Sequence, residues 1–179
     1  MSDLQERLAK IKALVIDADG VLTDGGILFP EVGQAVVRFH IQDGLGIVLA
    51  RRVGLEVAVL SGRSRIALAR RAEELGMTEV IQGVHNKVQA LRALAARRRW
   101  ALLEIAYMGD DLNDLPAMEI VGAALAVANA VEEVKRAAHW VAGKSGGEGA
   151  VREAIEVILS AQGRWEEAVR GYLEHLRNL

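Results

Sequence analysis

Short apolar runs alternate with longer segments of helical character along this chain. Ala13–Ile16 is a fully apolar run that ends at Asp17, and similar or shorter runs follow at 57–60, 80–81, 105–108, 123–127 and 140–141. Continuous apolar runs of this length predict strands that are buried on both faces. Strands that alternate with helices indicate an α/β domain built on a doubly wound, mainly parallel sheet.

Helix signals fill the intervals between these runs. We expect helices at about 43–54, 64–76, 86–99, 115–121, 131–137 and 150–159. Asp43 and Asn86 are predicted N-caps, and Gly54 and Gly76 stand where a helix ends. The glycine-rich segment 143–149 has two interpretations: it binds an anion at a helix start, or it lets two backbones approach closely.

Two segments stand outside this alternation. Residues 26–40 are predicted to form a β-hairpin, with Pro30 and Gly33 in its turn. The tail 164–179 is predicted to be an amphipathic helix, because its apolar residues recur at helical spacing, and its apolar face is suited to docking on a neighbouring subunit. We therefore expect one domain over 1–163 and a helical tail over 164–179.

The composition excludes several classes of protein. The chain of 179 residues contains no cysteine, which rules out disulfide bonds, a thiol nucleophile and cysteine-ligated metals. Its 22 basic and 24 acidic residues give a net charge of −2, which argues against a nucleic-acid-binding protein. No apolar run reaches the ~20 residues of a membrane span. The charged start lacks the apolar core of a signal peptide, so we expect a cytoplasmic protein.

Chemically reactive residues follow several of the predicted strands. The sequence DADG at 17–20 follows the first strand, SGR at 61–63 the next and GDDLND at 109–114 a later one, while Lys87 begins a helix. Ligands of open α/β sheets bind at the carboxyl ends of the strands, so these groups should meet at one edge. A single aspartate after a strand is usually a turn residue or a helix cap. The ordered combination is what indicates a catalytic site.

Carboxylates this close together would repel one another unless a cation lies between them. Mg²⁺ takes oxygen ligands and tolerates one or two carboxylates together with a substrate phosphate. We expect the side chains of Asp17 and Asp110 and the backbone carbonyl of Asp19 to ligate it. Ser61 and Lys87 would bind the phosphoryl group. Asp17 would attack phosphorus, and Asp19 would protonate the leaving group and later deprotonate the attacking water.

Four segments resemble, in order, the motifs of the haloacid dehalogenase (HAD) superfamily of phosphotransferases: VIDADGVLTDGG, LSGR, Lys87 and MGDDLND. The resemblance covers about residues 8–163. It implies a Rossmann-like three-layer fold, dependence on Mg²⁺ and the roles given above. Large cap domains of this superfamily are inserted after the first motif or between the second and third. Those intervals hold only the hairpin and one helix with one strand, so the chain resembles a capless member.

Further segments resemble the phosphatases of 3-deoxy-D-manno-octulosonate 8-phosphate (KDO 8-phosphate), among them HIQDGLGI, RRAEELGM, QGVHNK and SGGEGAVREA. That family makes free KDO for lipopolysaccharide and forms homotetramers in which the hairpins pack together. The resemblance implies that Asp111 and Asp114 support the metal ligands. It also implies substrate contacts at Asp19, His40, Ile41, Gln42, Asp43, Gly44, Gly62, Arg63, Arg71, Lys87 and Asn113.

Other functions compete with this one. Phosphatases of nine-carbon nonulosonate 9-phosphates, including sialic acid precursors, commonly carry glutamate at the position of Arg63, so the arginine favours the octulosonate. A dehalogenase is disfavoured because halide leaves without a proton and has no need of Asp19. A phospho-accepting receiver module also uses carboxylates, Mg²⁺ and a lysine, but its phosphorylated aspartate sits on a central strand, whereas here DADG follows the first core strand. A catalytically silent regulator is disfavoured because all four motif positions are filled.

Overall fold

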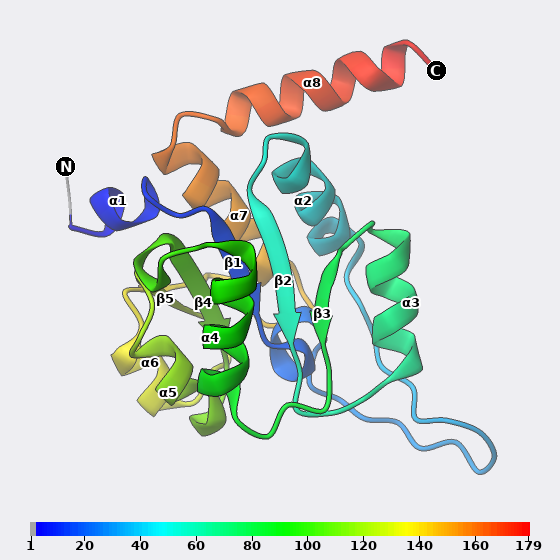
Figure 1. Cartoon of the computed structure of the whole chain (residues 1–179). Helices are drawn as coiled ribbons and strands as arrows, with labels where there is room; N and C mark the ends of the chain where they lie inside the picture. Colours follow the sequence, from blue (N-terminus) through cyan, green and yellow to red (C-terminus); the bar gives the residue numbers. More distant parts are fainter. Residues whose placement is uncertain (1–2) are drawn as a thin grey trace.

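The computed structural model describes residues 3–179, in which six strands form one sheet in the order β3-β2-β1-β4-β5-β6 (Figure 1). Every pairing between neighbours in this sheet is parallel, and Ile16 of β1 lies opposite Val59 of β2 and Met108 of β4. The predicted α/β fold is confirmed. The strands are β1 Ala13–Ile16, β2 Glu56–Leu60, β3 Glu79–Ile81, β4 Ile105–Gly109, β5 Ala123–Ala126 and β6 Trp140–Val141.

Helices cover both faces of the sheet. On one face, α5 contacts both α4 and α6, and on the other α2 packs along α7, with α1 and α8 extending that layer (Figure 1). β1, β4 and β5 are buried along their whole length, as their continuous apolar sequences require. The helices are α1 Asp3–Leu8, α2 Ile41–Arg52, α3 Ile66–Glu74, α4 Lys87–Arg98, α5 Leu115–Met118, α6 Glu132–Ala137, α7 Ala150–Ala161 and α8 Trp165–Arg177.

The predicted strands agree with the observed ones to within one residue at either end, and the helices to within about two or three. Asn86 caps α4 as predicted, because its side-chain oxygen accepts a hydrogen bond from the Gln89 amide at 2.9 Å. The short helix α1 was not predicted from the sequence. Among residues 3–179, no helix combines the length and the apolar character that a bilayer span requires.

The predicted N-cap role of Asp43 in α2 is wrong. That helix already begins at Ile41, and Asp43 lies within its first turn. Its fully buried carboxylate instead accepts hydrogen bonds from the backbone amides of Gly149 and Arg152, at 3.2 and 2.8 Å, and so caps the start of α7. Burial raises the pKa of Asp43 and outweighs the two amide donors, which lower it. The interaction joins two helices across the sequence.

Residues 26–40 extend from the body of the molecule as a hairpin-shaped loop (Figure 1). Within this segment an isolated antiparallel bridge joins Leu28 to Val36, and at its base another joins Phe39 to Thr23, rather than two continuous strands. Phe29 and Val32 near the tip are 80% and 90% exposed. This loop alone separates the turn after β1 from α2, and α3 alone separates β2 from β3, so no cap domain is inserted at either place in the described chain.

The glycine-rich segment 143–149 packs against the turn after β1. A Cβ atom on Gly146 would lie 1.7 Å from the carbonyl oxygen of Gly20, and one on Gly147 would lie 2.3 Å from the amide nitrogen of Asp24. Of the two interpretations of this segment, the structure supports the close approach of two backbones. The close packing of this segment restricts the position of the DADG turn.

The helix α8 packs on α2 and α7 of its own chain. Ala168 is buried there, and the guanidinium groups of Arg52 and Arg152 stack over the rings of Tyr172 and Trp165. Leu173 and Leu176, toward the end of the helix, remain 43% and 46% exposed. The apolar face predicted for the tail therefore packs on the chain in part and stays partly exposed, and docking on a neighbouring subunit stays a prediction.

Candidate active site

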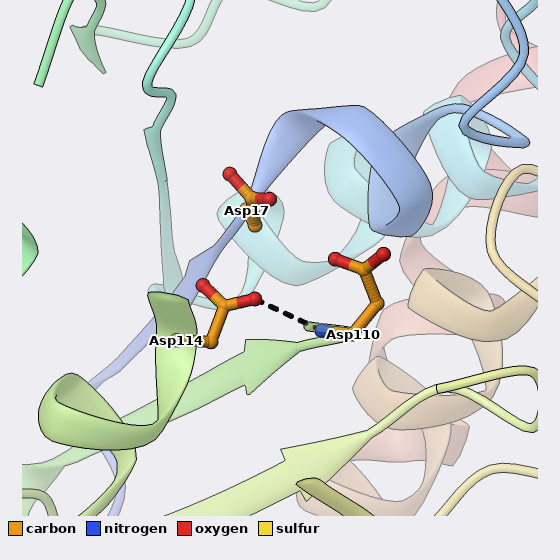
Figure 2. Close-up of side chains that lie close together, drawn as sticks. All are labelled: Asp17, Asp110 and Asp114. Carbon is orange, nitrogen blue, oxygen red and sulfur yellow. Dashed lines mark hydrogen bonds between the residues drawn. The ribbon is translucent and has the colours of Figure 1, made fainter. Parts of the chain in front are cut away.

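Three aspartates converge at the carboxyl edge of the sheet. Asp17 directly follows β1, Asp110 directly follows β4, and Asp114 ends the short helical turn Leu112–Asp114. One carboxylate oxygen from each lies within 4.8 Å of the other two (Figure 2). Parallel strands deliver their carboxyl ends to the same edge, which is why residues so far apart in the sequence meet.

Glycines make this convergence possible. Gly20 has φ +96°, and a Cβ atom there would lie 2.0 Å from Oδ2 of Asp110. At Gly109 a Cβ atom would lie 2.5 Å from the Cβ of Asp114. The glycine of DADG is thus required both by its backbone conformation and by the carboxylate that lies against it.

Lys87, the first residue of α4, neutralises part of this charge. Its buried Nζ lies 2.6 Å from Oδ1 of Asp114 and 3.0 Å from Oδ1 of Asp17. Burial alone would lower the pKa of Lys87, but the two carboxylates outweigh it and raise that pKa, so the amine stays charged. The ammonium therefore sits directly beside the side chain that is predicted to act as the nucleophile.

The carboxylate of Asp114 is fully engaged by protein donors. Besides Lys87, its Oδ1 accepts a hydrogen bond from the Tyr107 hydroxyl at 2.7 Å, and its Oδ2 accepts from the backbone amides of Asp110 and Asp111 at 3.0 and 3.3 Å. Asp114 thus orients both Lys87 and the loop that carries Asp110. Tyr107 was not among the residues predicted from the sequence; its signal is a hydroxyl within an otherwise apolar strand, which needs a partner when buried.

The negative charge of the other two aspartates is compensated only in part, for Asp17 by Lys87. Burial, followed by the charge of Asp114, raises the pKa of Asp17 to about 6. Burial, followed by the charges of Asp114 and Asp17, raises the pKa of Asp110 to about 7. Oδ1 of Asp110 is buried and has no hydrogen-bond partner among residues 3–179. Oxygen donors with excess negative charge fit a hard divalent cation such as Mg²⁺, with Asp17 and Asp110 as its side-chain ligands.

Asp19 lies beside this cluster and is partly exposed. Among the described residues, two guanidinium groups approach its carboxylate: Nε of Arg65 is 3.2 Å from Oδ1, and Nε of Arg63 is 3.8 Å from Oδ2. Asp19 opens onto one cavity of about 200 Å³ together with Asp17 and Asp110. It is lined by Asp17, Asp19, Gly62, Arg63, Asp110, Asp111 and Asn113.

The next candidate residues are Ser61, which follows β2, and the residues at the start of α2. The Ser61 hydroxyl is buried and donates to the carbonyl of Arg63 at 2.9 Å, while its oxygen accepts from the amide of the same residue. At the start of α2, Nδ1 of His40 is buried without a partner in the described chain, and Ile41 is 83% exposed. Gln42 lies in the same first turn and is exposed.

Arg71 on α3 faces the start of α2. A Cβ atom on Gly44 would lie 2.1 Å from Nη2 of Arg71, so the glycine is what allows the guanidinium to lie there. Nη1 of Arg71 pairs with Glu74 at 2.8 Å. Asp111 accepts a hydrogen bond from the amide of Leu112 and caps the short turn that carries Asp114.

Comparisons with known proteins agree with this geometry. The family profile described as haloacid dehalogenase-like hydrolase matches residues 72–155. The KDO 8-phosphate phosphatase KdsC of Haemophilus influenzae is 38% identical over 178 residues, covering 98% of this chain and 99% of the relative. KdsC of Escherichia coli K12 is 39% identical, covering 93% of this chain and 89% of the relative. The chain belongs to the KdsC family.

Solved structures of KdsC family members share the fold closely. The enzyme of Moraxella catarrhalis, in complex with a magnesium ion, a phosphate ion and KDO, is 36% identical with a TM-score of 0.92, covering 96% of this chain and 99% of that one. The cobalt-bound enzyme of Haemophilus influenzae is 40% identical with a TM-score of 0.88, covering 93% and 99%. Both contain a bound metal, magnesium in one and cobalt in the other, in agreement with the donor set of Asp17 and Asp110.

The raised pKa values predict how pH and Mg²⁺ affect stability. Unfolded aspartates titrate near pH ~3.9, whereas Asp17 and Asp110 titrate near 6 and 7 in the folded protein without metal. The folded state therefore holds extra protons in this interval, and that stabilisation is complete below the unfolded pKa and lost as pH rises through about 6 to 7. We expect the melting temperature of the chelated protein to fall between about pH 5 and pH 8.

Mg²⁺ should reverse this loss, because it replaces the protons between the carboxylates. Its stabilising effect in scanning calorimetry should be larger at pH 8 than at pH 5.5. The Asp110→Asn variant, which lacks one of the two carboxylates, serves as the control and should show a weaker dependence on both pH and Mg²⁺. A melting temperature of the chelated wild type that rises over this interval, or an Mg²⁺ effect that is equal at both pH values, contradicts this assignment.

Proposed function

We propose that this protein is a Mg²⁺-dependent phosphatase that hydrolyses KDO 8-phosphate to KDO and inorganic phosphate, a step in the formation of lipopolysaccharide precursors. The observation that carries the proposal is the meeting of Asp17, Asp19, Lys87 and Asp110 at one edge of the sheet. The nearly full-length similarity to KdsC proteins supports the choice of substrate.

Asp17 would act as the nucleophile. Its carboxylate lines the cavity, and Lys87 holds Oδ1 at 3.0 Å, which fixes the orientation of the side chain. A carboxylate oxygen attacks phosphorus, the bond from phosphorus to the ester oxygen breaks, and an aspartyl-phosphate forms. The Lys87 ammonium then lies close enough to offset negative charge on the transferred group.

Asp19 would act as the general acid for the leaving group and then as the general base for the attacking water. An alkoxide is a poor leaving group, so the ester oxygen needs a proton as its bond to phosphorus breaks. Asp19 donates that proton and becomes a carboxylate. It then accepts a proton from the water that attacks the aspartyl-phosphate, which releases phosphate and restores the protonated acid. Its position two residues after Asp17 places both groups on the same cavity.

Asp17, Asp110 and the backbone carbonyl of Asp19 would hold the Mg²⁺ ion. When bound, the ion supplies positive charge that offsets the phosphoryl oxygens and the neighbouring carboxylates. Asp114 and Asp111 support this arrangement from the protein side, through the contacts with Lys87 and with the backbone of the loop. Ser61 would turn its hydroxyl from the Arg63 carbonyl toward the phosphoryl group.

The sugar acid would contact the groups around the cavity. Gly62, Arg63 and Asn113 line it, and Arg63 is largely exposed at its mouth, where a guanidinium can meet an anionic substrate. We assign further contacts to the start of α2 (His40, Ile41, Gln42 and Gly44) and to Arg71. Asp43 is excluded from this set as a direct contact, because both of its oxygens accept hydrogen bonds from the start of α7.

A homo-oligomer, a tetramer as the resemblance to the family implies, would complete this open site. The loop 26–40 exposes Leu28, Phe29, Val32 and Val36. Apolar side chains gathered on a protruding loop are typical of an interaction surface, and symmetric self-association is the commonest way to cover one. The loop of one subunit would then border the site of another.

The function is tested by phosphate release from a panel of substrates. KDO 8-phosphate should be hydrolysed with a higher kcat/KM than a nonulosonate 9-phosphate or a hexose phosphate. EDTA should abolish the activity and Mg²⁺ restore it. Ca²⁺ should fail to restore it, because it prefers more ligands at longer distances. A higher kcat/KM for the nonulosonate 9-phosphate than for KDO 8-phosphate would mean that the nonulosonate is the substrate. Full activity after rigorous chelation would contradict the mechanism.

The assembly is tested by light scattering on the wild type and on a Phe29→Ser/Val32→Ser variant. We expect the wild type to have a mass several times that of one chain and the variant to form smaller species with weaker activity. Leu103 is 70% exposed on another part of the surface, so Leu103→Ser provides a matched control that should keep the wild-type mass. A fully active wild-type monomer at nanomolar concentration would contradict the proposal.

A further inference from the structure

Asp19 is held by a residue to which none of the four motifs assigns a role. Arg65 donates a hydrogen bond from Nε to Oδ1 of Asp19 at 3.2 Å, across 46 positions of sequence. Its side chain is only 12% exposed. A buried guanidinium that donates to a carboxylate forms a stronger and better-defined interaction than an exposed one.

Arg63 differs from Arg65 in this respect. Its Nε lies 3.8 Å from Oδ2 of Asp19, beyond hydrogen-bond distance, and its side chain is 63% exposed. An exposed ion pair of this kind is screened by water and contributes little to orientation. Arg63 is therefore available to the substrate at the mouth of the cavity, whereas Arg65 fixes the carboxyl group of Asp19 from the side.

The backbone of Arg65 is itself anchored. Its amide donates to Oε1 of Gln82 at 2.7 Å, and the residue occupies the position just before α3 begins. Its Nη2 is buried and has no hydrogen-bond partner among residues 3–179. With Nη2 unpaired, the side-chain hydrogen bond that Arg65 makes to the described residues is the one from Nε to Asp19.

We propose that Arg65 is a positioning residue for proton transfer by Asp19: by binding Oδ1, it orients the carboxyl group so that the other oxygen faces the ester oxygen of the substrate. This inference rests on the proposed function, because it assumes that Asp19 protonates the leaving group. Proton transfer depends steeply on the placement of the donor, and an error of about 1 Å can reduce a rate by roughly a hundredfold.

The test compares two substrates in the Arg65→Gln variant. The sugar-acid phosphate has an alkoxide leaving group that needs a proton, whereas the leaving group of p-nitrophenyl phosphate is stable as an anion. We expect kcat/KM for the sugar-acid phosphate to fall on the order of tenfold or more, and kcat/KM for p-nitrophenyl phosphate to change by less than about twofold. The ratio of the two values in one preparation does not depend on the fraction of folded enzyme.

Three further variants make the test specific. Arg70→Gln removes an exposed arginine from α3, the helix that follows Arg65, and should leave the ratio unchanged. Arg65→Lys keeps the positive charge without the planar group and should shift the ratio in the same direction by a smaller factor. In an Asp19→Asn background, Arg65→Gln should cause no further loss on the sugar-acid phosphate, because a residue that acts through Asp19 has nothing left to position.

The outcomes separate this inference from the proposed function. Equal losses on both substrates, or an additional loss in the Asp19→Asn background, would overturn the positioning role of Arg65 while leaving the phosphatase assignment intact. A rise in KM for the sugar-acid phosphate with unchanged kcat would also overturn it and would make Arg65 a substrate-binding residue. If the wild type hydrolyses neither ester, the proposed function itself fails.

Discussion

The structure depends on the electrostatic balance around Lys87. Asp17, Asp110 and Asp114 lie together at the edge of the sheet, and among the described residues Lys87 is the cation that touches two of them. Buried charges of one sign are unstable unless they are paired, protonated or bound to a metal. The protein satisfies Asp114 with its own donors and leaves Asp17 and Asp110 available for a cation. This difference between Asp114 and the other two aspartates determines which side of the cluster is open to a cation.

The parallel sheet explains why part of this site can be predicted from the sequence. β1, β2 and β4 are buried on both faces, so their apolar runs are readable, and the residues just after them must meet at one edge. Asp17 and Asp110 were found for this reason. The contrast drawn with receiver modules was wrong, because β1 is the first core strand in the chain yet lies between β2 and β4 in space. Strand order in the sheet is not chain order.

The site features that could not be predicted from the sequence are contacts between specific pairs of residues, most of them distant in the chain. The sequence predicts Asp43 as the cap of the helix in which it lies. Its side chain instead caps α7, which begins more than a hundred positions later. The contact of Arg65 with Asp19 spans two elements whose spacing carries no local pattern. Tyr107 reads as one more apolar residue of a strand until its hydroxyl is placed on Asp114. Local propensity and periodicity contain no information on such pairs.

The role of Asp17 is tested most directly by trapping the phosphoenzyme. The Asp19→Asn variant should slow the attack of water, whereas p-nitrophenolate leaves without a proton, so acid quenching during turnover of p-nitrophenyl phosphate, followed by mass spectrometry, should find a phosphoryl group on the peptide that contains Asp17. An Asp17→Asn variant treated in the same way should show no such modification and no phosphate release. Turnover by Asp17→Asn at a rate near that of the wild type, or a phosphoryl group on another residue, would contradict the mechanism.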